Sequence, residues 1–336
     1  MKKIRWGILS TAKIGREKVI PAMQEAKYCE VVAIASRIAE QAQSVARLLN
    51  IPKAYSSYEE LLNDEAIDAI YIPLPNHLHV EWSIKALNAG KHVLCEKPLG
   101  ASSSEAERLL KAAQEKPQLK VMEAFMYRFH PQWQYVKKLV DDGKVGGLKA
   151  IQSFFSYYNV DMNNIRNRKD AAGGAMMDIG CYCISWSRLL FGKEPERVFG
   201  VVEYDPRSQT DRLSSGILQF SSGISTFTCS TQLMPYQRVN ILGAEARLEV
   251  EIPVNAPPDK STRVWIHSKN GSEEVVFDAT NQYTIQGDIF SQAVLDNTDI
   301  PLTLEDSINN MRVIEAVFES AEKNSWKELN TSQVIK

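Results

Sequence analysis

The sequence has few cysteines and histidines, little net charge and no long apolar run. Its 336 residues include only five histidines and carry a formal net charge of −2. This balance leaves no basic excess to neutralise nucleic-acid phosphates, so we expect no DNA or RNA partner. No apolar run is long enough to cross a bilayer, and the N-terminal run Trp6–Leu9 is too short for a signal-peptide core, so we expect no membrane partner.

The cysteines indicate reduced thiols and a cytoplasmic location. Their number is odd, and most are far apart in the sequence, which does not suit a disulfide framework. The Cys181-x-Cys183 spacing could suit a metal, but no second Cys or His pair lies nearby at ligand spacing. We therefore expect structural thiols and no metal site. The five residues are Cys29, Cys95, Cys181, Cys183 and Cys229.

The composition, 44% hydrophobic and 24% charged, is that of a globular protein. Residues 1–122 alternate short apolar segments with amphipathic ones, which predicts repeated βα units, right-handed crossovers and a doubly wound parallel sheet of the Rossmann type. The predicted strands are Ile4–Leu9, Glu30–Ser36, Ala69–Ile72, His92–Cys95 and Lys120–Met122. The predicted helices are Ile14–Gln24, Ala39–Leu49, Tyr58–Asn63, His77–Asn88 and Ser103–Gln114.

Residues 123–336 have a different pattern, with longer strand-like runs that predict an α+β domain around a mostly antiparallel open sheet. Only a few helices are left to cover this sheet, so we expect one face to form a homodimer or a higher oligomer. The predicted helices are Pro131–Val140, Tyr283–Leu295 and Leu304–Lys323. The predicted strands are Leu148–Tyr157, Arg197–Tyr204, Ser214–Phe220, Ile224–Ser230, Val239–Leu242, Arg247–Ile252, Arg263–His267 and Glu274–Phe277.

A dinucleotide site is predicted after the first strand. The dinucleotide fingerprint G-x-G-x-x-G is replaced here by Ser10, Ala12 and Gly15, all small residues. The following helix N-terminus would present backbone amides to the phosphates. An ordinary βα turn of small residues is the alternative. The candidate contacts in this turn are Ser10, Thr11, Ala12, Lys13 and Ile14.

Two further strand ends add candidate cofactor contacts. Ser36 and Arg37 occupy the place where NAD-specific sites carry an acidic residue, and an Arg can bind a 2′-phosphate, so we expect NADP, with NAD possible. A surface Arg with no ligand is the alternative. Asn76 after the third apolar strand could instead cap a helix. The candidates at that strand end are Leu74, Pro75, Asn76 and His79.

Two motifs carry ionisable groups suited to proton transfer. Glu96-Lys97-Pro98 ends a strand, and Pro98 keeps Lys97 out of helical conformation, with a cis peptide as an option. Asp178 and Tyr182 stand four residues apart, on one face of a predicted helix. A lysine, a carboxylate and a phenol are suited to acid–base chemistry. A solvated charged turn, a helix cap and a packing tyrosine are the alternatives.

Together these motifs resemble the Gfo/Idh/MocA oxidoreductase family, in particular its branch of dimeric dihydrodiol dehydrogenases and D-xylose 1-dehydrogenases. The resemblance covers nearly the whole chain. It implies an NAD(P)-dependent enzyme acting on a sugar, polyol or diol, with Lys97 catalytic and Glu96 in contact with the cofactor. It also implies that Tyr182 carries the proton and that Asp178 orients Lys97 or the substrate. The motifs are Cys95–Pro98, Pro75-Asn76-x-x-His79, Glu123–Pro131 and Gly173–Tyr182.

Two other functions are weighed against this one. A non-catalytic dinucleotide-binding regulator of the same fold would not need Lys97, Asp178 and Tyr182 together. A short-chain dehydrogenase would need Tyr-x-x-x-Lys, and none of the twelve tyrosines has a Lys four residues later. Phe125, Tyr127, Phe155 and Tyr157 are candidates for lining a substrate pocket, although such aromatics more often belong to a core.

Overall fold

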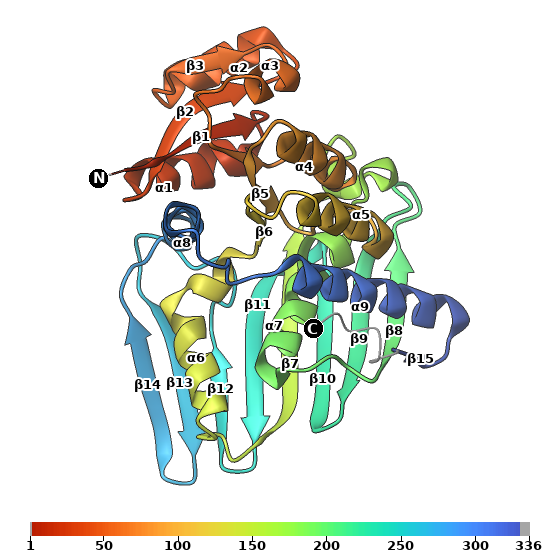
Figure 1. Ribbon diagram of the computed structural model, residues 1–336. Coiled ribbons are helices and arrows are strands. Elements are labelled where there is room, and N and C mark those ends of the chain that lie inside the picture. Colours follow the sequence, from red (N-terminus) through yellow and green to blue (C-terminus); the bar gives the residue numbers. More distant parts are fainter. Residues whose placement is uncertain (1, 330–336) are drawn as a thin grey trace. The chain divides into compact units, whose positions relative to one another are not determined.

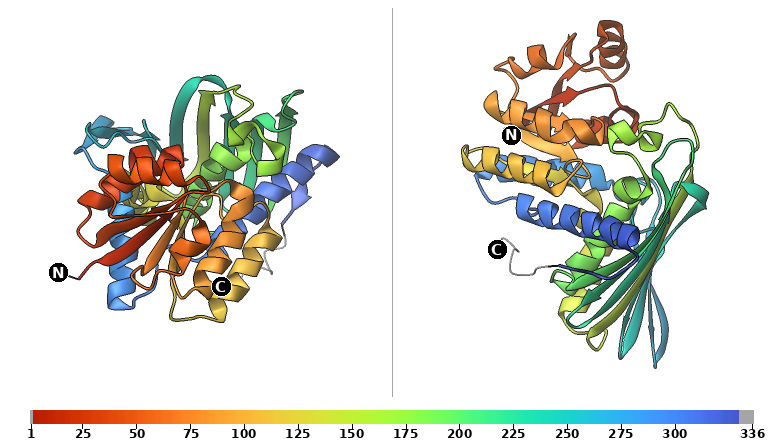
Figure 2. Two further views of the ribbon diagram at one scale, coloured as in Figure 1. Left: turned by 90° about the horizontal axis from the view of Figure 1, so that it is seen from above. Right: turned by 90° about the vertical axis from the view of Figure 1, so that its right-hand side faces the viewer.

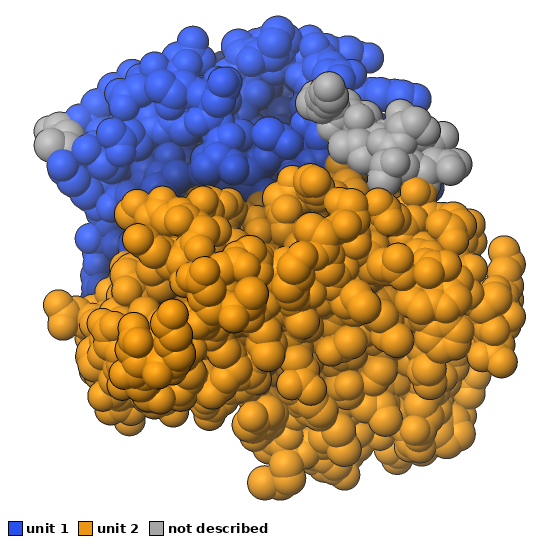
Figure 3. All heavy atoms as spheres, turned by 90° about the horizontal axis from the view of Figure 1, so that it is seen from below, with its two compact units in different colours: residues 1–126, 282–308 blue, residues 127–281, 309–336 orange. Residues whose placement is uncertain are grey.

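The computed structural model describes residues 2–329 of the chain. They form two compact units, one made of residues up to 126 with 282–308, the other of 127–281 with those from 309 onward (Figure 3). These units differ from the division 1–122 and 123–336 predicted from the sequence, because a C-terminal segment returns to the first unit. No helix within residues 2–329 is both long and apolar enough to cross a membrane.

The first unit contains a parallel sheet whose six described strands have the order β3-β2-β1-β4-β5-β6 (Figure 1). This order is that of a doubly wound dinucleotide-binding sheet, in which the direction of strand addition reverses between β1 and β4. Ligands bind such sheets outside the carboxyl ends of the strands at that point. The strands are β1 (Ile4–Leu9), β2 (Cys29–Ala35), β3 (Lys53–Tyr55), β4 (Ala69–Ile72), β5 (His92–Glu96) and β6 (Val121–Ala124).

The helices of this unit pack on strands that, apart from β3, are mostly buried. Leu9, Ile72 and Val93 belong to one apolar core with side chains of the helices. Strand β3 was not predicted; it has only three residues, two of them exposed, so it lacks the apolar run that marks the other strands. The helices are α1 (Ile20–Glu25), α2 (Ala39–Leu48), α3 (Tyr58–Leu62), α4 (His79–Asn88) and α5 (Ser103–Gln114).

Helix α8 (Gln282–Asp296) is the segment that joins the first unit from far along the chain. The indole of Trp6 donates to Ser291 Oγ at 3.1 Å, and the Tyr28 amide donates to Asp288 Oδ1 at 2.7 Å. Gly287 makes this packing close, because a Cβ there would lie only 3.0 Å from the Cys29 sulfur. Contacts between residues so distant in sequence leave no local pattern, which is why the sequence placed this helix in the second domain.

The second unit contains a sheet with the described strand order β14-β13-β12-β11-β7-β10-β9-β8-β15. All its pairs are antiparallel except β7 with β10, which confirms the predicted mostly antiparallel sheet. The strands are β7 (Leu148–Tyr158), β8 (Arg197–Tyr204), β9 (Asp211–Phe220), β10 (Gly223–Ser230), β11 (Gln232–Gly243), β12 (Ala246–Val250), β13 (Thr262–Ser268), β14 (Gly271–Phe277) and β15 (Lys327–Glu328).

Helices cover one face of this sheet, as the right-hand view of Figure 2 shows. They are α6 (Pro131–Asp141), α7 (Cys181–Phe191) and α9 (Leu304–Lys323). Side chains alternate accordingly: Val198 is buried, whereas Val201 is 62% exposed. Among the described residues no helix lies on the opposite face.

Candidate active site

The turn after β1 has the backbone shape that a glycine normally provides. Ser10 has φ 95°, in the left-handed region, and its Oγ accepts a hydrogen bond from the Ala12 amide at 3.2 Å. Its hydroxyl also donates to the Pro73 carbonyl at 3.4 Å, which joins the loops after β1 and β4 at the reversal point of the sheet. Serine thus holds the turn that the fingerprint assigns to glycine, at a conformational cost of about 1–3 kcal/mol.

The segment after this turn differs from the predicted α-helix. It begins as a π-helical turn, Gly15–Val19, before α1. Thr11, Ala12 and Ile14 are partly exposed at the start of this segment, and the Lys13 side chain is 78% exposed beside Glu17. All the predicted residues of this turn therefore lie where backbone amides at a helix N-terminus can meet phosphates.

Strand β2 ends at the predicted ribose-binding position. Ser36 is buried, and its hydroxyl accepts from the Ile38 amide at 3.2 Å, so it shapes the turn. Arg37 is exposed, and its guanidinium interacts with the Tyr58 hydroxyl, whose pKa burial raises and Arg37 lowers. An exposed guanidinium steadied in this way can pair with a phosphate.

The loop after β4 is tied to the loop after β5 by His79. Its ring is fully buried, with Nδ1 2.7 Å from the Pro98 carbonyl and Nε2 2.7 Å from the Leu74 carbonyl. Burial lowers its pKa to about 4, against the effect of the two carbonyls. Pro75 and Asn76 are partly exposed beside it, and neither the Asn76–Leu78 turn nor α4 has a side-chain N-cap bond. Asn76 itself is the N-cap residue of neither element, since those residues are Pro75 and Leu78.

Strand β5 ends with the ionisable pair. The Lys97–Pro98 peptide is cis, the option left open by the sequence. Glu96 accepts a 2.7 Å hydrogen bond from the Tyr71 hydroxyl on the neighbouring strand β4. Burial raises the pKa of Tyr71 well above its ordinary value, and the Glu96 carboxylate adds to this. Tyr71 is thus a neutral donor that orients Glu96, a role the sequence analysis missed because it depends on strand pairing.

In the second unit, Asp178 lies in a π-helical turn, Met176–Gly180, and Tyr182 lies in α7 directly after it. The predicted α-helical start is therefore wound differently. The Asp178 side chain is 12% exposed, and its Oδ2 accepts from the Tyr157 hydroxyl at 2.6 Å and from Arg166 Nε at 2.8 Å. The Tyr182 ring is packed by Tyr127, with ring centroids 5.8 Å apart.

A buried carboxylate that the sequence analysis did not single out, Asp211, holds the start of the Met176–Gly180 turn. Asp211 Oδ2, at the start of β9, accepts from the Met176 amide at 2.7 Å and from Ser214 Oγ at 2.8 Å. Burial raises its pKa to about 7. Gly174 lies against it with φ 122°, and a Cβ on Gly174 would lie 1.9 Å from Asp211 Oδ1. The glycines of the Gly173–Tyr182 motif were the only sequence signal of this close approach.

The Glu123–Pro131 motif also acquires a physical role. The Tyr127 hydroxyl is 2.8 Å from Ser185 Oγ, and Arg128 donates to the same oxygen at 2.9 Å. His130 caps α6 by accepting from the Gln132 amide at 3.2 Å. Phe125, Tyr127 and Phe155 are buried and Tyr157 is partly exposed, so only Tyr157 among these aromatics has both exposure and a contact with Asp178.

The parallel sheet, its strand order and the turn at Ser10 define a dinucleotide-binding protein with a second, mostly antiparallel unit. Family models match the two parts: an oxidoreductase family with an NAD-binding Rossmann fold over residues 4–125, and the Gfo/Idh/MocA C-terminal domain over 133–249. The chain belongs to the Gfo/Idh/MocA family of oxidoreductases, which confirms the resemblance seen in the sequence.

Known proteins resemble the chain over nearly its full length. It is 41% identical to an uncharacterized oxidoreductase of Rhizobium meliloti, covering 97% of this chain and 99% of the relative. It is 38% identical to D-xylose 1-dehydrogenase (NADP(+)) 2 of Haloferax volcanii, again over 97% and 99%. The 3-ketoreductase of Actinomadura kijaniata, solved with NADP and TDP-benzene, superposes with a TM-score of 0.90 at 30% identity over 95% and 98%.

Proposed function

We propose that this protein is an NADP-dependent dehydrogenase or reductase that acts on one carbinol or carbonyl carbon of a sugar-like, polyol or diol substrate. The observation that carries the proposal is the presence of Lys97, Asp178 and Tyr182 together in a chain of this family. A regulator that only binds the dinucleotide would need none of these three groups. The NADP-dependent xylose dehydrogenase and the NADP-bound ketoreductase among its relatives support the substrate class and the cofactor.

The cofactor assignment rests on the loops at the reversal point of the parallel sheet. The left-handed Ser10 turn opens the backbone before a helix N-terminus, which suits a pyrophosphate. Arg37 is exposed where an acidic residue would repel a 2′-phosphate, and this favours NADP over NAD. When bound, the nicotinamide donates or accepts the hydride. Glu96, held by Tyr71, is proposed as a further contact.

The protein's own residues handle the substrate oxygen. Hydride transfer at carbon must be matched by movement of a proton at oxygen. In the proposed mechanism, Lys97 binds this oxygen through its ammonium group, and the Tyr182 phenol exchanges the proton with it. Asp178, four residues before Tyr182, orients Lys97 or the substrate.

The proposal is tested by incubating the protein with NADP, or with NADPH for the reverse direction, and following absorbance of the reduced cofactor. The substrate panel contains aldoses, inositols, keto-sugars and dihydrodiols. Turnover of at least one class is expected. Cofactor binding without turnover of any of them would favour the regulator instead.

Two substitutions then test the roles of the residues. Tyr182→Phe keeps the packing of the ring and removes the hydroxyl, so kcat should fall about 10²–10⁴-fold, the usual contribution of acid–base catalysis. Tyr158→Phe is the matched control, because Tyr158 is 64% exposed. Lys97→Met should cost at least as much, and the double variant should lose less than the product. A Tyr182→Phe enzyme with wild-type kcat, under conditions where an isotope effect shows hydride transfer to limit the rate, would make Tyr182 a packing residue.

A homodimer or higher oligomer is part of the same proposal. The sheet face without helices carries exposed apolar side chains, including Val201 and Ile224, among ion pairs such as Arg263–Glu274. A surface of this mixed kind suits an interface in which each copy presents the same patch.

A further inference from the structure

We propose that Arg166 and Tyr157 are positioning residues that fix the Asp178 carboxylate for the reaction, an inference that rests on the function proposed above. Neither residue belongs to the motifs that identify the family in this sequence. Both donate to the same oxygen, Asp178 Oδ2, at 2.8 and 2.6 Å. Two directional bonds to one oxygen fix the rotation of a carboxylate, which one bond does not.

The charges of the three groups are matched to this role. The Asp178 carboxylate raises the pKa of Arg166 above its ordinary range, so Arg166 remains a cation. Burial, and then the same carboxylate, raise the pKa of Tyr157 far above its ordinary value, so Tyr157 remains a neutral donor. The Asp178 side chain is only 12% exposed, and its charge therefore depends on these partners.

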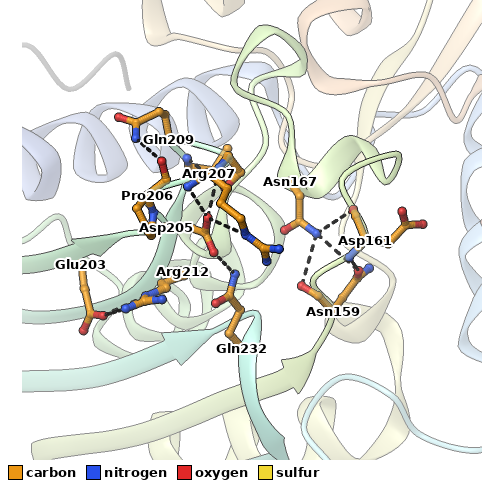
Figure 4. Close-up of polar contacts among 12 residues, drawn as sticks. Asn159, Asp161, Asn167, Glu203, Asp205, Pro206, Arg207, Gln209, Arg212 and Gln232 are labelled. Atoms are coloured by element: carbon orange, nitrogen blue, oxygen red, sulfur yellow. Dashed lines mark hydrogen bonds and ion pairs between the residues drawn. The ribbon is translucent and has the colours of Figure 1, made fainter.

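The loop between β7 and the Met176 turn is built to hold Arg166 in place. Asn164 accepts from the Arg166 amide at 3.0 Å through its side-chain oxygen. The buried Asn167 amide donates to the carbonyls of Asn159 and Asp161, at 3.2 and 2.9 Å, and closes the loop (Figure 4).

The loop that carries Arg166 packs against Gly173 and Gly174, the first two residues of the Gly173–Tyr182 motif. The Gly174 amide donates to the Arg166 carbonyl at 2.8 Å. A Cβ on Gly173 would lie 2.5 Å from that carbonyl oxygen and 2.6 Å from the one of Ile165. The motif therefore supplies Asp178 and also the space that the backbone of Ile165 and Arg166 occupies.

The test is a double-mutant cycle on kcat with Arg166→Ala and Asp178→Asn. Arg166→Ala alone should lower kcat about 10–100-fold, the scale of a misplaced catalytic group, and leave KM for NADP unchanged. In the Asp178→Asn background the same change should have little further effect, because Arg166 acts through Asp178. Guanidinium at millimolar concentration should restore part of the activity of Arg166→Ala, and Arg166→Lys should retain more activity than Arg166→Ala.

The matched control is Arg168→Ala. Arg168 lies on the same loop and pairs with the exposed Asp170, so its loss should leave kcat within a factor of two. Tyr157→Phe should lower kcat in the same direction as Arg166→Ala and serves if that variant fails to fold. The proposal would be overturned if the losses of kcat in Arg166→Ala and Asp178→Asn were independent of one another. It would also be overturned if Arg166→Ala changed only the KM of the sugar, because Arg166 would then be a substrate ligand.

Failure of the proposed function is recognised separately, because it would appear as a wild-type protein without turnover on the whole panel. The double-mutant cycle is then measured on the free energy of unfolding in urea instead of on kcat. A fixed Arg166–Asp178 pair predicts coupled losses of stability, and additive losses would reject the positioning role without reference to any substrate.

Discussion

Replacing Gly174 by alanine tests whether the approach of Asp211 holds the Met176–Gly180 turn in place. Gly174 has φ 122°, and its new Cβ would lie 1.9 Å from Asp211 Oδ1. Gly271, in the β13–β14 hairpin of the same unit, has φ 121° and no atom within 4 Å of an added Cβ. Alanine would therefore meet the same backbone strain at both positions, but only alanine at position 174 would also clash with a neighbouring atom.

The magnitudes follow from this comparison. Alanine at such a φ costs roughly 1–3 kcal/mol, and this should be the whole loss of unfolding free energy in Gly271→Ala. Gly174→Ala should lose a further amount of about 1–3 kcal/mol for overpacking. Displacing the Asp211 carboxylate also weakens its bonds to the Met176 amide and Ser214, which adds about 1 kcal/mol or more.

The assay is equilibrium urea unfolding followed by circular dichroism and tryptophan fluorescence, with equal m-values required for the comparison. Gly174→Ala should also lower kcat, because the turn it distorts carries Asp178, whereas Gly271→Ala should not. Adding Asp211→Ala to Gly174→Ala should recover part of the stability by removing the clashing carboxylate. Equal losses for the two glycine variants would refute the reasoning.

Three further predictions concern the cofactor, pH and assembly. Arg37→Asp should reverse the preference from NADP to NAD in kcat/KM; a wild-type preference for NAD would contradict the assignment. Because burial raises the pKa of Asp211 from 3.8 to about 7, the folded state binds the extra proton and stability should fall as pH rises from about 4 to 7. This loss, at most about 4 kcal/mol, should be absent in Asp211→Asn when unfolding is measured across that range. Sedimentation at micromolar concentration should show a homodimer or larger species, and a monomer alone would reject the sheet-face interface.

Local patterns were sufficient to predict the fold class and to name most residues of the candidate site. Apolar segments alternating with amphipathic ones predicted the parallel sheet, because strands covered on both faces must be apolar. The turn at Ser10, the Lys97–Pro98 pair and the Asp178–Tyr182 spacing are short segments, and each is readable from adjacent residues. The left-handed conformation of Ser10 is compatible with the sequence, but the sequence alone did not predict it.

The tertiary structure decided what depends on residues distant in sequence. Strand β3 was too short and too exposed to be recognised, and α8 joined the first unit through Trp6 and Tyr28, which lie more than 250 residues away. Tyr71 meets Glu96 only because β4 and β5 pair in register.

The same reason explains why the residues that hold Asp178 and its turn were not predicted. Arg166, Tyr157 and Asp211 come from a loop and two strands, and an arginine, a tyrosine and an aspartate have no periodicity of their own. By itself, the sequence determined which chemical groups the protein carries and which local turns present them. Only the folded chain decided which donors meet the Asp178 oxygen, because hydrogen bonds act over about 3 Å and their partners are brought together by packing.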